Sequence, residues 1–139
     1  MCGMGNVMNT QQTYRCPCTS GLVFDDCCRP ILTGHKRAVT AESLVRTRFC
    51  AHVVRDYDYL LQTWHPVTRP VTLDLPARRF WYWLDIDAVV GGGPQEDTGS
   101  VAYTAYRRDG QEHASISELA HLERYHGWWV YRSGEAMGD

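Results

Sequence analysis

Residues 79–90 read RFWYWLDIDAVV, and the spacing of their hydrophobic side chains decides the fold class. Before this stretch the hydrophobic residues recur every three to four positions, whereas from residue 79 they alternate with a period of two. The alternation gives two sets of side chains, Phe80, Tyr82, Leu84 and Ile86 on one face and Trp81, Trp83, Asp85 and Asp87 on the other. A period of two is typical of a β-strand, so the stretch predicts the first strand of a sheet.

The chain after this strand predicts a sheet whose strands follow one another in sequence. Residues 91–100, GGGPQEDTGS, indicate a long flexible turn, and residues 100–132 indicate three further strands in a meander. Asp109-Gly110 is a strong signal for a two-residue hairpin turn, and His126-Gly127 is a weaker one.

The chain before the strand predicts two helices. Thr40 is a favourable N-cap, and hydrophobic or aromatic residues then recur at helical spacing through residue 53, at Ala41, Leu44, Val45, Phe49, His52 and Val53. A second, short helix is expected to open at Asp56, to carry Trp64 and to end at Pro66. Helices followed by an antiparallel sheet predict an α+β domain, in which a twisted sheet wraps over the helices as a cone with a pocket.

Length and charge exclude several classes of protein. A chain of 139 residues has room for one compact domain and a small appendage, and its net charge of −2 gives no signal for nucleic acid binding. The first ten residues lack the features of a signal peptide, and no stretch is apolar enough for a membrane helix. We therefore expect a cytoplasmic protein without membrane contact. Its expected organisation is a flexible tail (1–14), a knuckle (15–34), the α+β domain (35–134) and a second tail (135–139).

The knuckle contains CPCTSGLVFDDCC, residues 16–28, with four cysteines in the pattern C-x-C, eight residues, C-C. Four thiolates make a closed tetrahedral zinc site, whose structural zinc stabilises a segment too short to have its own core. This interpretation makes Cys16, Cys18, Cys27 and Cys28 the metal ligands. The alternative is a disulfide clamp, which the adjacent pair Cys27-Cys28 disfavours because neighbouring cysteines bridge only with strain. Cys2 and Cys50 are interpreted as bystanders.

The same stretch resembles the SEC-C motif, a zinc knuckle also found in the SecA translocation motor. LVRTRFCAHVVRDYDYLLQTWHPVTRP (44–70) and GWWVYRSG (127–134) resemble the YchJ family of bacterial proteins. The resemblance implies an N-terminal SEC-C knuckle with zinc on the four cysteines, followed by a cone-shaped nuclear transport factor 2-like domain. It implies no known biochemical role. Thr19 departs from the motif, which usually has glycine at this position.

Glu118 is the candidate polar residue of the cone. The Asp109-Gly110 turn fixes the strand register so that Tyr103 faces Ile116, and Glu118 then shares the apolar face of the sheet. A buried carboxylate needs a partner, and Arg48 beside the apolar stripe of the first helix is the expected one. The favoured interpretation is a structural ion pair between these two side chains.

The alternative makes Glu118 a general base, assisted by His65 or Arg48, in a pocket lined by aromatic residues, Trp64, Tyr103, Trp129 and Tyr131.

Two functions follow from these patterns. In the first, which we favour, the protein is a binding module, and a zinc-stabilised knuckle presents Leu22, Val23 and Phe24 to a protein partner. The SecA resemblance then implies a ribosome or an export factor, and the cone is a scaffold or holds an unknown small ligand. In the second, the cone is a hydratase-, isomerase- or hydrolase-type enzyme that uses Glu118. A filled cone favours the module, and a partly polar cavity with Glu118 at its floor favours the enzyme.

Overall fold

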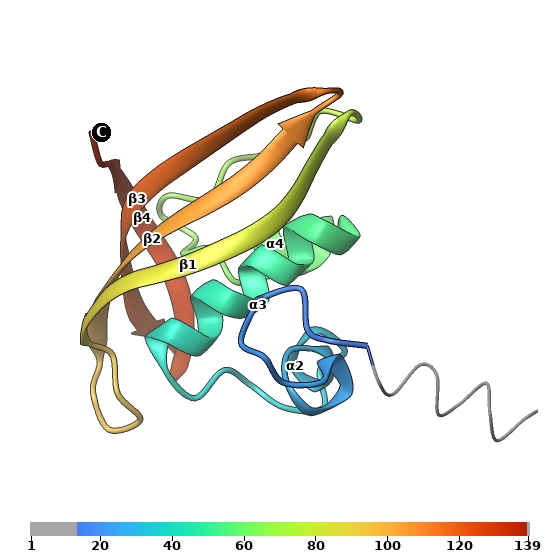
Figure 1. Ribbon diagram of the computed structural model, residues 1–139. Helices are drawn as coiled ribbons and strands as arrows, with labels where there is room; N and C mark the ends of the chain where they lie inside the picture. Colours follow the sequence, from blue (N-terminus) through green and yellow to red (C-terminus); the bar gives the residue numbers. More distant parts are fainter. Residues whose placement is uncertain (1–13, 139) are drawn as a thin grey trace, which may run out of the picture.

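The computed structural model describes residues 14–138 and consists of a cysteine-rich segment, helices and one sheet (Figure 1). The elements in chain order are the 3-10 helix η1 (Phe24–Asp26), the helices α2 (Arg29–Leu32), α3 (Ala41–Val54) and α4 (Tyr57–Gln62), and the strands β1 (Arg79–Gly91), β2 (Thr98–Asp109), β3 (Glu112–Tyr125) and β4 (Trp128–Ala136). The predicted α+β class is confirmed. Residues 1–13 of the expected N-terminal tail lie outside the described residues, and β4 extends past the expected boundary at residue 134.

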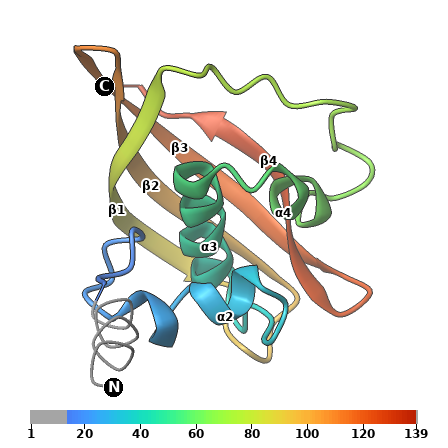
Figure 2. The ribbon, with the colours of Figure 1, turned by 90° about the vertical axis from the view of Figure 1, so that its right-hand side faces the viewer.

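The four strands form an antiparallel meander in the order β1-β2-β3-β4. The sheet is curved, and α3 lies across its concave face, with α2 and the cysteine-rich segment beside one end of α3 (Figures 1 and 2). Buried side chains between α3 and the sheet form the largest core cluster, Ala41, Leu44, Val45, Val101, Ala120, Leu122 and Trp129. The main core therefore lies between α3 and the concave face of the sheet.

The expected strict alternation in β1 is wrong, because the strand is bulged. The register against β2 shifts between Trp81 and Trp83, and a bulge inserts an extra residue that turns the following side chains. As a result Trp81 shares the inward face with Leu84 and not with the exposed Trp83, and it packs edge-on against Phe49 of α3 at 6.4 Å between ring centroids. Tyr82 instead places its hydroxyl 3.1 Å from His113 Nδ1.

The first hairpin turn consists of Gly110 and Gln111, one position later than expected. Asp109 pairs with Glu112, and Gly110 has a φ of 64°, which suits the first central position of a type II′ turn. The shift moves every pair in the hairpin by two residues, so Tyr103 lies opposite Glu118. The side chains keep their predicted faces because the shift is even.

The start of α3 is fixed by its cap and by two glycines. Thr40 Oγ1 accepts a hydrogen bond from the backbone N–H of Ser43 at 3.0 Å, as predicted. The N–H of Ala41 donates to the carbonyl oxygen of Gly92 at 2.9 Å. A methyl group on either Gly92 or Gly99 would collide with its surroundings, including the side chain of Ala41. The glycine-rich turn was expected to be a long flexible link. It instead packs against the first residue of α3 and fixes where the helix begins.

The helix α4 is shorter than predicted and ends before Trp64. Asp56 caps its start by accepting from Tyr59 N–H at 3.1 Å. Beyond its end, Trp64 forms an isolated parallel bridge with Tyr131 of β4, and the N–H of His65 donates to the Tyr131 carbonyl oxygen at 2.8 Å. This pairing attaches the segment after α4 to the sheet edge and places Trp64 over the concave face.

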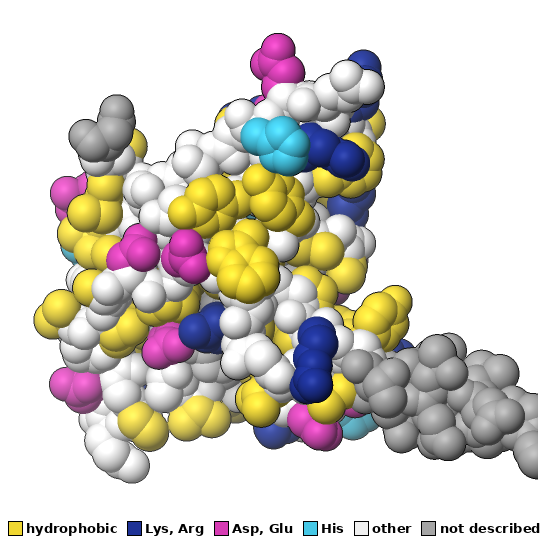
Figure 3. Space-filling view, in the orientation of Figure 1, with side chains coloured by type: hydrophobic (Ala, Val, Ile, Leu, Met, Phe, Trp, Pro, Cys, Tyr) yellow, Lys and Arg dark blue, Asp and Glu magenta, His cyan; other side chains and the backbone are white. Residues whose placement is uncertain are grey.

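Tryptophan occupies both sides of the sheet. Trp129 is buried, whereas Trp83 is 50% exposed and its indole N–H donates to Asp85 at 2.9 Å. Figure 3 shows hydrophobic side chains next to acidic ones over the region where β1 runs in Figure 1. Among the described residues, no helix has the length and apolar character that a membrane crossing requires.

Candidate metal centre and ligand pocket

The four cysteines of the knuckle converge on one point. Cys16 and Cys18 precede a tight turn, Cys27 follows η1, and Cys28 caps the start of α2. Their Sγ atoms all lie within 4.8 Å of one another, with 3.6 Å between Cys18 and Cys27 and 3.9 Å between Cys27 and Cys28. Four sulfurs around a tetrahedral zinc ion lie about 3.8 Å apart when each Zn–S bond is about 2.3 Å. The cluster therefore fits a four-coordinate metal ion.

A small hairpin sets up this convergence. The N–H of Cys16 donates to the Leu22 carbonyl oxygen, and the N–H of Phe24 donates to the Tyr14 carbonyl oxygen, each at 2.8 Å. Gly21 supplies the turn with a φ of 91°, a conformation that suits glycine. The two halves of the motif are thereby folded onto each other.

A fifth thiol, on Cys50 of α3, touches the cluster. Its Sγ lies 3.5 Å from that of Cys16, and the residue is fully buried. Cys50 lies outside the group of four, so the prediction that it is not a ligand stands, although α3 packs directly against the knuckle. Cys2 lies outside the described residues. Every cysteine that the structure describes is a free thiol, which does not support the disulfide alternative.

The thiols of the cluster share hydrogen bonds. Contacts from Cys16, then Cys28 and Cys50, lower the pKa of Cys18 because they stabilise its thiolate. Contacts with Cys16 and Cys18, together with burial, raise the pKa of Cys28 and of Cys50. A cation held by four thiolates would therefore displace protons from the other ligands as it binds.

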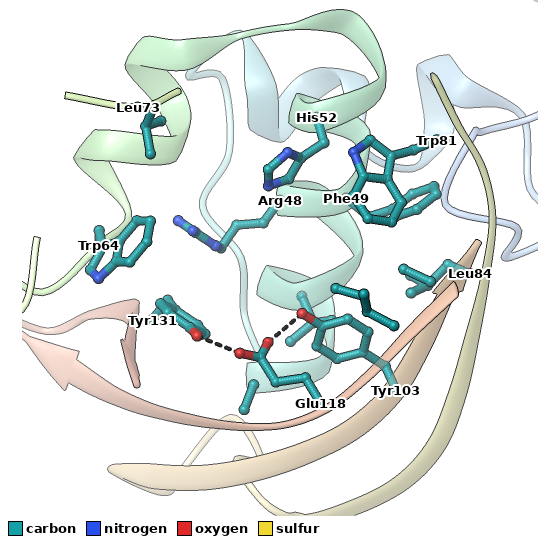
Figure 4. Close-up of a pocket in the computed structure, with 14 residues that line it drawn as sticks. Arg48, Phe49, His52, Trp64, Leu73, Trp81, Leu84, Tyr103, Glu118 and Tyr131 are labelled. Atoms are coloured by element: carbon teal, nitrogen blue, oxygen red, sulfur yellow. Dashed lines mark hydrogen bonds between the residues drawn. The ribbon is translucent and has the colours of Figure 1, made fainter. Parts of the chain in front are cut away.

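The cone is not filled. A cavity of about 260 Å³ lies between α3, the concave face of the sheet and the segment after α4 (Figure 4). Its walls are mostly apolar, and its polar and aromatic side chains include Arg48, His52, Trp64, Tyr103, Glu118 and Tyr131. Three of the four aromatic residues expected in the pocket thus line it.

Glu118 is held by two tyrosines on the cavity wall. Tyr103 donates to its Oε1, and Tyr131 donates to its Oε2 at 2.7 Å. Burial and the neighbouring carboxylate raise the pKa of both tyrosines above the ordinary value, so their hydroxyls stay protonated. A methyl group on Gly134 would collide with the Glu118 carboxylate and the Tyr131 hydroxyl. The absence of a side chain at this position makes room for the arrangement.

The predicted ion pair between Arg48 and Glu118 is wrong. Arg48 Nη1 donates instead to the Leu60 carbonyl oxygen at 2.8 Å and to Thr63 Oγ1 at 2.7 Å. The physical reason is the position of α4, whose last turn offers oxygen acceptors closer to the guanidinium than the carboxylate. Among residues 14–138, no carboxylate lies within 4.0 Å of Arg48.

Two aromatic rings enclose the guanidinium. Arg48 Cζ lies 5.1 Å from the ring centroid of Trp64 and 4.9 Å from that of Tyr131, distances typical of cation–π contacts. Figure 4 shows the guanidinium reaching toward Trp64, away from Glu118. Burial lowers the pKa of Arg48 to about 10, so the side chain stays charged at neutral pH.

Two predicted site residues lie outside the cavity. His65 Nδ1 accepts from the Val67 N–H at 3.0 Å, and its Nε2 lies 3.3 Å from Glu123 Oε2, so it cannot assist Glu118. Trp129 is 3% exposed, and its indole N–H donates to the Val39 carbonyl oxygen at 3.0 Å. The linker before α3 covers this end of the sheet, which removes Trp129 from the expected pocket.

His52 was not predicted as a site residue, yet it lines the cavity. Its ring packs edge-on against Trp81 at 6.0 Å between centroids. Burial, followed by repulsion from Arg48, lowers its pKa from 6.5 to about 4, so the imidazole is neutral at physiological pH. Its position four residues after Arg48, on the same face of α3, is the sequence signal that would have found it.

Comparison with known proteins identifies the family. Residues 40–134 match the family model described as the YchJ middle NTF2-like domain. The chain belongs to the YchJ family. A UPF0225 protein of Corynebacterium efficiens is 41% identical over 121 residues, covering 87% of this chain and 92% of the relative. A UPF0225 protein of Streptomyces coelicolor is 42% identical over 125 residues, covering 90% of this chain and 98% of the relative.

A solved structure extends this YchJ relationship to the knuckle. The solution structure of RPA3114, a SEC-C motif containing protein from Rhodopseudomonas palustris, is similar with a TM-score of 0.77 at 28% identity. The aligned region covers 88% of this chain and 98% of the RPA3114 chain. The resemblances to the SEC-C motif and to the YchJ family are thus confirmed.

The SEC-C knuckle of this YchJ-family chain is fastened to the edge of the sheet. Thr19, where the motif usually has glycine, has a φ of 65°, in the left-handed region that favours glycine. Its hydroxyl donates to the carbonyl oxygen of Leu84 in the edge strand β1. Arg46 Nη1 adds a hydrogen bond to the Cys18 carbonyl oxygen at 2.9 Å. Thr19 therefore carries some backbone strain, but its hydroxyl gives the knuckle a direct hydrogen bond to the sheet that glycine could not make.

Proposed function

We propose that this YchJ-family protein is a small-molecule-binding protein, with the ligand in the cone and a structural zinc ion in the SEC-C knuckle. The observation that carries the proposal is the cavity of about 260 Å³ with a buried arginine in its wall. Ligand pockets are typically about 300–1,000 Å³, mostly apolar, with a few placed polar groups. The cone has this composition and lies just below this size range, which suits a ligand smaller than a drug-sized molecule.

The knuckle exposes less hydrophobic surface to a protein partner than expected. Leu22 is 54% exposed, but Val23 and Phe24 are partly buried, and Phe24 packs against the cysteine cluster. A single exposed leucine is common on protein surfaces and marks no interface. A ribosome or export factor as partner therefore has little support from the knuckle surface, and the unfilled cone favours a small ligand.

The proposed zinc has a structural role. All four donors are cysteines, three of them are buried, and four thiolates leave no open position for substrate or water. The described part of the knuckle has only short helices and one bridge, so metal binding would supply much of its folding free energy.

The open, partly polar cavity with Glu118 in its wall is the outcome expected of an enzyme. Binding is nevertheless favoured over catalysis because of how Glu118 is held. Both carboxylate oxygens already accept tyrosine hydroxyls. Accepting a substrate proton would disrupt one of these contacts, and His65 lies outside the cavity. We therefore assign Glu118 a positioning role: it orients the two tyrosines that form part of the wall.

A pair of neighbouring substitutions tests the proposal. Ile116 lines the cavity, whereas the adjacent exposed Ser115 lies on the other face of β3. Ligand-observed NMR with a library of single-ring compounds should find binders to the wild type. Ile116→Trp should abolish their signals by filling the cavity, and Ser115→Trp should leave them intact. A library without binders, or binders unaffected by Ile116→Trp, would refute a ligand site in the cone.

A further inference from the structure

We propose that the cone selects a small aromatic carboxylate, whose carboxylate pairs with Arg48 and whose ring lies between the aromatic walls. This inference rests on the proposed ligand-binding function and names the chemical class of the ligand. It is carried by four features of the cavity: a buried cation without a counter-ion, a free edge of its guanidinium, flat aromatic walls, and a single positive charge.

The first feature is the unpaired charge of Arg48. The residue is 9% exposed, and burying a charge without a partner is costly. The hydrogen bonds from Nη1 to Leu60 and Thr63 reach neutral oxygens, which satisfy donors but do not neutralise the charge. An anion beside the guanidinium would remove this cost, so the cavity favours anionic ligands over neutral ones of the same shape.

The second feature is the edge of the guanidinium that remains available. Arg48 uses Nη1 for both of its hydrogen bonds, and no acceptor in residues 14–138 hydrogen-bonds Nε or Nη2. These two nitrogens form one edge of the planar group, and Arg48 lines the cavity. Two parallel hydrogen bonds to that edge match the two oxygens of a carboxylate.

The third feature is the shape of the walls. Trp64 and Tyr131 flank the guanidinium, while Phe49, Trp81 and Tyr103 also line the cavity. Aromatic rings pack well edge-to-face and in offset stacks, so these walls suit a flat ring better than a branched aliphatic chain. The volume of about 260 Å³ favours a single ring over a larger ligand.

The charges of the cavity favour a monoanion. Arg48 is the one cationic side chain among the residues that line it, because His52 is neutral at physiological pH. Glu118 lies across the cavity with both oxygens fixed by tyrosines (Figure 4). A dianion such as a phosphate monoester would bring two charges against one cation and face this carboxylate. A carboxylate brings one.

Calorimetric titration at pH 7.5 with three probes of matched shape tests the inference. The probes are benzoate, benzamide and benzylamine, which differ in charge but share one ring. Benzoate should bind at least ~10-fold more tightly than benzamide, because only benzoate brings a negative charge to the buried guanidinium. Benzylamine should bind most weakly. This comparison needs only the wild-type protein.

Arg48→Met should reduce benzoate affinity at least ~10-fold, to the level of benzamide, and change benzamide affinity much less. Arg46→Met is the matched control, because Arg46 lies on the same helix, pairs with Glu42 at 3.0 Å and does not line the cavity. The control should bind benzoate as the wild type does.

Equal affinities for benzoate and benzamide in the wild type would overturn the inference and leave ligand binding by the cone intact. Benzoate binding that persists in Ile116→Trp would also overturn it, because the probe would then occupy another site. Failure of all three probes to bind would overturn the inference alone, because the library screen tests ligand binding by the cone separately.

Discussion

Tyr131 donates a hydrogen bond to Glu118 Oε2 at 2.7 Å, and the face of its ring lies 4.9 Å from Arg48 Cζ. One side chain of β4 thus contacts both charged groups of the cone. The cation and the carboxylate remain apart, each with neutral partners. This separation leaves Arg48 available to a ligand and gives the cavity one cationic and one anionic wall.

Double-mutant cycles should detect this arrangement. The pair Tyr131→Phe and Glu118→Gln should show a coupling energy of about 1 kcal/mol, because the two groups share a partly buried hydrogen bond. The pair Arg48→Met and Glu118→Gln should show a smaller one, because no ion pair joins them. Urea unfolding measures both. A larger coupling for Arg48 and Glu118 would restore the structural ion pair.

Gly134→Ala should destabilise the protein by roughly 1–3 kcal/mol, because its methyl group would displace the Glu118 carboxylate and the Tyr131 hydroxyl. Gly138→Ala is the control, since a Cβ there meets nothing within 4 Å. The two urea midpoints give the comparison. If they coincide, the close packing of Glu118 on Gly134 does not exist.

Metal content should separate the ligand cysteines from their neighbour. After purification without added chelator, the wild type should contain about one zinc per chain, and Cys28→Ser should lose most of it because a structural site needs four ligands. Cys50→Ser should keep its zinc, since Cys50 lies outside the group of four. Atomic emission spectroscopy measures both. Zinc loss in Cys50→Ser with retention in Cys28→Ser would reassign the ligands.

The free energy of unfolding should decrease at acidic pH, because the buried His52 side chain resists protonation in the folded state. Because the pKa of His52 drops from 6.5 in the unfolded chain to about 4 on folding, the unfolded state binds more protons between these values. The stability is fully present above pH 6.5 and is lost as the pH falls toward 4. A difference of one in pKa corresponds to about 1.4 kcal/mol, so the loss is roughly 1–3 kcal/mol.

His52→Phe should remove this part of the pH dependence. Urea unfolding of both proteins at several pH values between 4 and 7 gives the difference, in which metal release and other titrations common to both cancel. Parallel curves for wild type and variant would contradict a neutral buried imidazole at this position.

The sequence predicts those parts of the fold that local interactions determine. The Thr40 cap, the helical spacing after it and the start of the first strand at residue 79 all depend on near neighbours, and each is found. The first turn was misplaced because the positive φ of Gly110 suits either central position of a hairpin turn. The bulge at Trp81 was missed because period counting assumes an unbroken pleat.

The site was harder to predict because its contacts join distant segments. The face of Glu118 followed from strand alternation, but its partners depended on the register and on Tyr131 of another strand. The partner of Arg48 depended on where α4 ends. No sequence motif marks Cys50, because Cys50 contacts the knuckle only when α3 packs against the knuckle.

The central claim is that the cone holds the ligand, and indole resonances test it most directly. Trp64 and Trp81 line the cavity, whereas Trp83, Trp128 and Trp129 do not. In ¹H–¹⁵N spectra of the wild type titrated with benzoate, the indole signals of Trp64 and Trp81 should shift while the other three stay in place. Shifts confined to Trp83, Trp128 or Trp129, or no shifts at saturating benzoate, would contradict the account.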